Sequence, residues 1–221
     1  MQTVFEDASR NRNVTIAAIQ AIELLAFDRS NPKSAPLLDE ALDTLLAAYS
    51  KKGKAGTWIV QSHCAGALAQ LAGTDHARSP SIRRLFAAEL DRKKSLRMRD
   101  LARSAALGLG KICAPNKSKT SVDREYSKLL MDTFLKHKDA QTRYFSLIAL
   151  GQIDGEHNLA FLLQALKSGS YFERPWAAIA LGLQAHDRYE LPWHAKISEN
   201  LNYRSAVETQ TDQQSGVLDI L

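Results

Sequence analysis

The sequence predicts an all-α fold, a solenoid of about four full helix pairs with flanking helices. Three observations predict it. Alanine, serine, glycine and cysteine make up 62 of the 221 residues, a composition that suits closely packed helices. Four alanine-rich segments repeat along the chain, and apolar stretches with helical spacing lie between them. The repeats are centred on leucines separated by 41, 41 and 31 residues, namely Leu68, Leu109, Leu150 and Leu181.

The elements are expected in a regular order. A helix from Asn13 to Phe27 precedes the repeats. Each repeat begins with an amphipathic helix A, which follows a turn rich in Pro, Gly, Asn, Asp or Ser. The A helices are expected at Pro36 to Ser50, Ser81 to Asp91, Val122 to Leu135 and Asn158 to Leu166. Each is followed by a helix B that contains one of the four leucines, and a further helix is expected from Leu191 to Arg204.

Small residues occupy fixed positions around each leucine. The residues four before it, one before it and one after it are Ala, Gly, Ser or Cys in all four segments; in the third they are Ser146, Ala149 and Gly151. Positions four and one before the leucine are three residues apart and therefore lie on one face of a helix. We expect this face to let neighbouring helices approach closely, while the leucine fills the space between layers.

Two of the B segments resemble a known repeat. They read Asp139-Ala-Gln-Thr-Arg143-Tyr-Phe-Ser-Leu-Ile-Ala-Leu-Gly151 and Arg174-Pro-Trp-Ala-Ala-Ile-Ala-Leu-Gly182. An Asp that opens helix B, an Arg four residues later and a closing Ala-Leu-Gly resemble the HEAT-repeat family, especially the short bacterial repeats of the phycobilisome-lyase type. The resemblance covers about two thirds of the chain. It implies an α-α superhelix whose surface holds a partner, and it implies no reaction.

The first two pairs depart from this pattern. In the second pair the charged residues stand at other positions than in the family pattern, namely Arg99, Asp100 and Arg103. The first pair has Gln61 at the position of the Arg.

Composition indicates a soluble chain with one domain. It is 45% hydrophobic and 24% charged, and neither a signal peptide nor a spanning segment is visible. We therefore expect a single cytoplasmic domain over residues 1–221, complete or cut from a longer array, without membrane insertion. Cys64 and Cys113 are too few for a disulfide framework or a zinc site. On adjacent B helices the two cysteines would be offset by about 12 Å along the helix axis. A disulfide bond cannot span that separation, so we expect both thiols to be free.

Positive charge is concentrated in the middle of the chain. The formal net charge is +5, but Lys51 to Lys119 carry +11 and the remainder carries −6. The densest run, from Arg92 to Arg103, covers the second A–B turn and the start of the next helix B, with Arg83 and Arg84 just before it. Such a surface would attract an acidic or phosphate-rich partner.

These features favour a non-catalytic scaffold or adaptor that binds a macromolecular partner, an acidic protein or peptide, along the surface of the B helices. The residues expected to contact the partner recur near the starts of these helices. They are Arg99, Arg103, Arg143 and Arg174, with Arg92, Lys93, Lys94 and Arg97 as a basic lobe. The alternative for Asp139, Arg143 and Arg174 is structural, with Asp139 capping a helix and the arginines tying layers together.

Other functions stay open. The same positive charge suits nucleic acid, and HEAT-like DNA glycosylases for alkylated bases are similar in size, charge and fold, although none of their functional residues aligns here. The phycobilisome-lyase resemblance implies, more remotely, a chromophore lyase or a chaperone.

The sequence carries no pattern that specifies a metal, a cofactor or a catalytic nucleophile. None of the six histidines has metal-ligand spacing. The segment Gly108-Leu-Gly110-Lys111 lacks the upstream Gly and the following Ser or Thr of a phosphate-binding loop. Trp58 and Trp176 open two of the B helices, and we expect them to pack between layers.

Overall fold

The computed structural model describes residues 11–25, 27, 31, 33–50, 57–90, 98–115 and 120–185. Every element of regular secondary structure in these ranges is a helix, which confirms the all-α prediction. The chain divides into two compact units, Met1–Cys113 and Ala114–Leu221, and each is described by itself. The helix expected from Leu191 to Arg204 lies outside the described residues.

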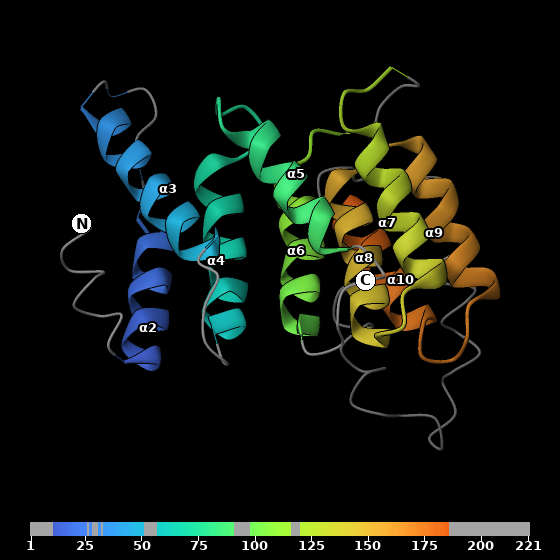
Figure 1. Cartoon of the computed structure of the whole chain (residues 1–221). Coiled ribbons are helices and arrows are strands. Elements are labelled where there is room, and N and C mark those ends of the chain that lie inside the picture. The colour runs from blue at the N-terminus through green and yellow to red at the C-terminus, as the bar shows by residue number, and fades with distance from the viewer. Residues whose placement is uncertain are drawn as a thin grey trace. The chain divides into compact units, whose positions relative to one another are not determined.

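The described part of the first unit contains two helix pairs and a preceding helix. Its helices are α2 (Arg12–Glu23), α3 (Ser34–Ser50), α4 (Thr57–Ala72), α5 (Ser79–Glu89) and α6 (Arg99–Ile112). Helix α3 packs on α4 and α5 packs on α6, while α4 contacts both α2 and α6 (Figure 1). Helix α2 therefore packs on α4 in the way that α4 packs on α6, so it takes the position of a B helix.

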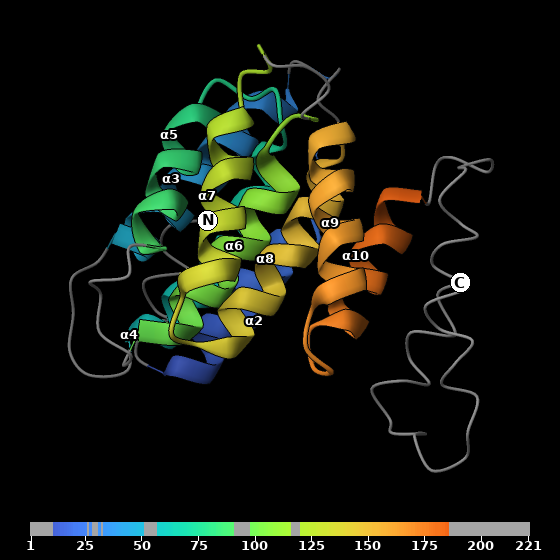
Figure 2. The same ribbon diagram turned by 90° about the vertical axis from the view of Figure 1, so that its right-hand side faces the viewer.

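The described part of the second unit contains two further pairs. They are α7 (Arg124–Lys136) with α8 (Ala140–Ile153), and α9 (Glu156–Ser168) with α10 (Arg174–Ala185). Helices α9 and α10 lie next to one another (Figure 2), and the two B helices α8 and α10 also pack on each other. In both units the ends of the A helices differ from the predicted ends by no more than two residues.

The repeated leucines form the centre of the core. All four are fully buried, and so are the small residues four positions and one position before them. The residues one position after the leucines are also buried, except for half-buried Gly182. The expected close-packed stripe is thus present on α4, α6, α8 and α10, and each buried leucine contributes about 1.5–3 kcal/mol of hydrophobic stabilisation.

Glycine permits the closest helix contact in the second unit. A Cβ atom added at Gly151 on α8 would lie only 2.2 Å from the carbonyl oxygen of Ala180 on α10. The obstructing atoms belong to a backbone, so they cannot move aside without displacing the helix. Glycine is therefore required at position 151 for the observed spacing of α8 and α10.

An aromatic pair spans the A helices of each unit. In the first unit Tyr49 of α3 meets Phe86 of α5 edge-on, with ring centroids 5.7 Å apart. In the second unit Phe134 of α7 meets Phe161 of α9 in the same manner, again at 5.7 Å. Such edge-on pairs add about 0.5–1.5 kcal/mol beyond the apolar area they bury, and the second pair forms part of a cavity described below.

The turn between α8 and α9 is short and well supported. Asp154 and Gly155 both have positive φ, 62° and 113°, which explains the Asp-Gly sequence predicted to form this turn. Fully buried Asn158 donates hydrogen bonds from its Nδ2 to the carbonyls of Leu150 and Asp154. It thereby gives a second hydrogen bond to the Leu150 carbonyl, which also accepts from the Asp154 amide, and a hydrogen bond to the Asp154 carbonyl just beyond the end of α8.

Substitution of Gly151 by Ala tests the close contact of α8 and α10. The added methyl group must push the two backbones apart, so we expect a loss of about 2–3 kcal/mol in the free energy of unfolding, measured by urea titration. Gly66→Ala is the matched control, because the three described atoms nearest to its added Cβ all belong to the flexible Glu23 side chain, the first of them at 3.4 Å. That variant should be neutral or stabilised by up to about 1 kcal/mol. Equal effects of the two changes would contradict the packing described here.

Candidate functional site

The basic residues singled out from the sequence fall into three groups. Arg92, Lys93, Lys94 and Arg97 lie outside the described residues. Arg99 is exposed at the first residue of α6, and Arg103, one turn later, pairs with Asp100 at 3.1 Å. The third group, Arg143 and Arg174, belongs to the second unit.

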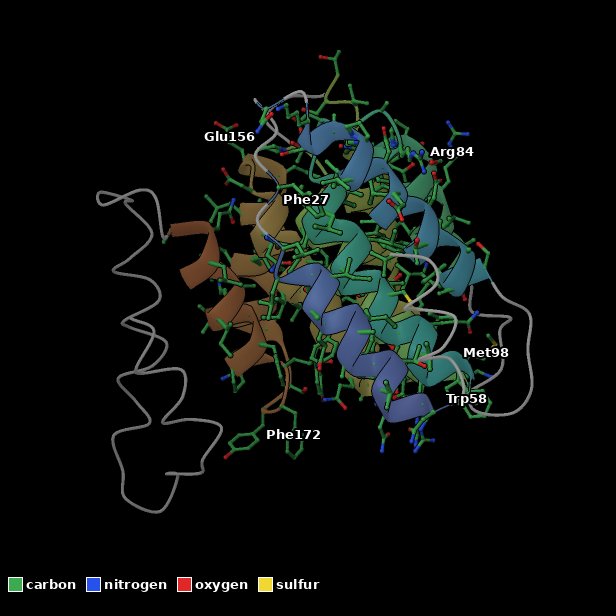
Figure 3. The ribbon with its side chains drawn as sticks, turned by 90° about the vertical axis from the view of Figure 1, so that its left-hand side faces the viewer. Phe27, Trp58, Arg84, Met98, Glu156 and Phe172 are labelled. Carbon is green, nitrogen blue, oxygen red and sulfur yellow. The ribbon has the colours of Figure 1, made fainter. Side chains whose placement is uncertain are left out.

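Arg83 is not part of the basic surface. Its side chain is buried, with Nε donating to the Ile112 carbonyl at 3.0 Å and Nη2 donating to the Thr74 carbonyl at 2.6 Å. Ile112 is the last residue of α6 and Thr74 follows α4, so this guanidinium joins the ends of two B helices to α5. Its neighbour Arg84 is exposed and points away from the helices (Figure 3). The concentration of positive charge in the sequence therefore includes a cation that no partner can reach.

The exposed side of α6 carries alternating charges. Its solvent-facing residues follow helical spacing and are called the α6 face. They are Asp100, Arg103, Ser104, Leu107 and Lys111, with exposed Arg99 beside them.

The α6 face extends onto two other helices. The Lys111 ammonium lies 3.8 Å from the Glu23 carboxylate of α2. The same carboxylate lies beside Gly66 of α4, 3.4 Å from the position a Cβ would take there. The Glu23 side chain of α2 thus lies against both α4 and α6. The exposed sides of these three helices are therefore continuous.

Arg143 and Arg174 make contacts within the second unit. Arg143 Nη2 lies 3.3 Å from Glu173 Oε1, and Arg174 Nε donates to the Gly169 carbonyl at 2.9 Å. Asp139 caps α8 by accepting a hydrogen bond from the Thr142 amide at 2.9 Å. The helix-capping role predicted for Asp139 is confirmed, and both arginines join helix starts to the turn between α9 and α10.

Arg143 also lines a cavity of about 240 Å³, called the Arg143 cavity. Its apolar wall consists of Phe134, Leu135, Phe161 and Ala165, and its polar wall consists of Arg143, Gln164, Ser168, Gly169 and Glu173. The Nε atom of Arg143 is buried and has no hydrogen-bond partner. Leu135 is 62% exposed although it lies next to the buried Phe134.

The Arg143 cavity was not predicted from the sequence. The available signal was the pair Phe134-Leu135 at the end of a helix, where helical spacing leaves the second residue outside the core. The other lining residues come from α8, α9 and the turn that follows α9, so no local pattern unites them.

The first unit has a second cavity, of about 340 Å³, beside the start of α3 and the turn before α5. Its lining includes Phe27, Leu38, Asp39 and His76. Nearby, Arg78 forms two hydrogen bonds with Asp43, and the guanidinium holds the pKa of that carboxyl below its usual value. The charges of Arg78 and Asp43 compensate one another at an exposed site. Their contact therefore holds the turn before α5 in place and leaves little net charge to attract a ligand.

Trp176 packs in the way the sequence suggested. Its ring stacks on Tyr144 with centroids 5.6 Å apart and meets Phe145 edge-on at 5.9 Å. It therefore joins α10 to α8, while Trp58, at the second residue of α4, is half-buried. Another aromatic pair, Tyr171 with Phe172, is exposed in the turn before α10, and Phe172 projects away from the helices (Figure 3).

Within the described ranges, no group of three or more His, Cys, Asp or Glu side chains could hold a metal ion. None of the helices in these ranges combines the length and the apolar character needed to cross a membrane. The chain matches no model of a known protein family, and no curated protein matches it either.

The role of Arg83 can be tested by replacing it with Met, which retains an unbranched apolar side chain of similar length. The buried Ile112 carbonyl and the partly buried Thr74 carbonyl both lose the Arg83 donor, so we expect the free energy of unfolding to fall by about 2–4 kcal/mol. Arg84→Met removes the same charge from an exposed position and should change stability by less than about 0.5 kcal/mol. Chemical unfolding of both variants decides between a structural and a surface role for Arg83. Equal stability of the two variants would refute the structural role.

Burial of Cys64 predicts a pH-dependent contribution to stability. Both cysteines are free and buried, and burial raises the pKa of the Cys64 thiol to about 12. An unfolded thiol ionises near pH 8.5, so between about pH 9 and 11 the unfolded state loses a proton that the native state keeps. The free energy of unfolding must therefore fall as pH rises.

The measurement is urea unfolding of the wild type and of Cys64→Ala under reducing conditions at about pH 8 and pH 10.5. The wild type should lose its advantage over the variant at the higher pH. Titrations of other groups are common to both proteins and cancel in the difference. A difference that stays constant with pH would show that the thiol ionises equally in both states.

Proposed function

We propose that this chain is a HEAT-like solenoid that acts as a non-catalytic scaffold and binds an acidic segment of a partner protein on the α6 face. The observation that carries the proposal is the direct packing of α2 on α4 and of α4 on α6. Because the helices touch, their exposed sides form an extended surface, which suits an elongated macromolecular ligand better than a small molecule.

The charges on this surface support an acidic ligand. Arg99, Arg103 and Lys111 lie on or beside the α6 face, where Arg103 pairs with Asp100 and Lys111 pairs with Glu23. These ion pairs are solvent-exposed and therefore weak. A partner carboxylate can replace the chain's own at small cost, while the cations steer its approach.

A nucleic acid is the second candidate, because exposed cations also attract phosphates. No aromatic side chain belongs to the α6 face, so stacking on unpaired bases has no support on this surface. Nucleic-acid binding would thus rest on phosphate contacts alone, and its affinity would fall steeply with salt.

The test is fluorescence anisotropy with a labelled glutamate-rich peptide and a labelled DNA duplex at low and moderate salt. The double variant Arg99→Glu/Arg103→Glu should weaken peptide binding by about tenfold or more through lost and reversed charge. Its matched control is Lys128→Glu/Lys167→Glu, which makes the same change in net charge at exposed positions of the second unit. The control should bind the peptide within about twofold of the wild type.

Equal losses in the two double variants would show that net charge alone drives binding, and would contradict a specific surface. Tighter binding of the duplex than of the peptide would favour the nucleic-acid alternative instead. Circular dichroism of each variant checks that its helices persist.

A further inference from the structure

We propose that the outer side of α2 is a homodimer interface, on which the α2 helix of a second copy of this chain packs antiparallel across a two-fold axis. The surface involved is called the α2 stripe. It consists of Val14, Ala17, Ala21, Leu24 and Leu25. This inference goes beyond the proposed acidic contact, because no residue of the α2 stripe belongs to the α6 face. Either proposal can fail without the other.

Helix α2 is apolar on two sides. The side that packs on α4 carries the buried Ile19 and Ile22. The α2 stripe follows a second row of residues spaced by three and four, and all of its members are exposed. Val14 is 50% exposed and Leu24 is 84% exposed. A helix with one partner normally presents polar residues to water on its other side. The apolar second side of α2 therefore indicates a second partner.

The packing of the B helices shows which kind of partner fits this side. Helix α4 uses two sides, one against α2 and one against α6. Helix α2 also takes the position of a B helix, but among the described helices it packs extensively on α4 alone (Figure 1). The alanines of the α2 stripe resemble the small residues through which the B helices approach one another. Another helix can therefore continue the same packing on the α2 stripe.

The α2 stripe is complementary to a second copy of itself. Ala17 and Ala21 lie two residues on either side of Ile19, and both are exposed. Val14 and Leu24 lie five residues on either side of the same position, and Leu24 still has helical backbone angles. With a two-fold axis level with Ile19, Ala17 of one copy opposes Ala21 of the other. Val14 likewise opposes Leu24. A two-fold interface requires such reciprocal pairs.

The distribution of charge also favours a second copy over a charged partner. The α2 stripe has no charged residue, and Arg12 is the one exposed charged side chain of α2. Glu23 is half-buried and pairs with Lys111 of α6. Two copies of a chain with a net charge of +5 repel one another, so they approach best along an uncharged surface. An acidic partner would find no cation on the stripe itself.

The size of the contact determines how strong the dimer can be. A contact along one helix is smaller than the roughly 1,600 Å² buried in a stable interface of standard size. We therefore expect a reversible dimer with a micromolar Kd. Sedimentation velocity of the full chain between about 1 and 200 μM should show a monomer–dimer equilibrium.

Two alanine positions separate a specific interface from a general effect of charge. Ala21→Glu brings two carboxylates close together at the centre of the dimer contact, so it should raise the Kd at least about tenfold. Ala88→Glu is the matched control, because Ala88 is an exposed alanine of α5 outside the α2 stripe. Its Kd should stay within about twofold of the wild type. Glutamate is a good helix former, so circular dichroism of both variants should show unchanged helix content.

Paired cysteine variants test the antiparallel orientation. A mixture of Ala17→Cys and Ala21→Cys should form an intermolecular disulfide on mild oxidation, because these positions oppose each other. Either variant alone should cross-link at least about tenfold less, since equal positions are offset by about 6 Å along the axis in addition to the spacing of the helices. A tag on one variant identifies the mixed dimer by mass. The native Cys64 and Cys113 are buried.

A chain that stays monomeric over the whole concentration range would overturn the proposal and would leave the α2 stripe to another part of the chain. Assemblies larger than a dimer would also overturn it, because they indicate head-to-tail contacts. So would equal effects of Ala21→Glu and Ala88→Glu, or equal cross-linking of each cysteine variant with itself. Peptide binding to the α6 face is measured below the dimer Kd, so its failure is distinguishable from these outcomes.

Discussion

The close contact between successive B helices is the constraint on which the rest of the structure depends. In the second unit it brings the Ala180 carbonyl within 2.2 Å of the position that a Cβ on residue 151 would occupy, so glycine is required there. Buried leucines then fill the space beside the contact, and the A helices pack on the outside of the paired B helices. Because the B helices touch along their small residues, the sides that face water become continuous, and these exposed sides are where a partner can bind.

Charged side chains serve two separate purposes in this protein. Some cations satisfy backbone carbonyls, as Arg83 does for Ile112 and Thr74, and as Arg174 does for Gly169. Others lie on exposed faces, where their ion pairs are weak and can be exchanged for contacts with a ligand. Arg143 belongs to neither group, because its guanidinium is paired with the Glu173 carboxylate while its buried Nε lacks an acceptor. Net charge therefore overstates the basic surface that is available to a partner.

Much of the fold could be predicted from the sequence because close helix packing requires small and apolar residues at regular helical spacing. The small residues around Leu150 occupy fixed positions, and helical spacing alone indicates which of them share a face. The position of α2 was less clear, since it belongs to no complete repeat. The buried contacts of Arg83 and the Arg143 cavity could not be predicted, because both depend on the ends of helices that are distant in sequence. A surface arginine and an arginine that caps another helix look the same in a linear sequence.

Native-state hydrogen exchange tests most directly whether contacts between B helices hold each unit together. Amides near Leu68, Leu109, Leu150 and Leu181 should exchange most slowly, with free energies close to that of complete unfolding of their unit. The A helices α3, α5, α7 and α9 pack on the outside and should open at lower free energy. Equal or greater protection of these outer helices would contradict the account, because the core would then not depend on the contacts between B helices.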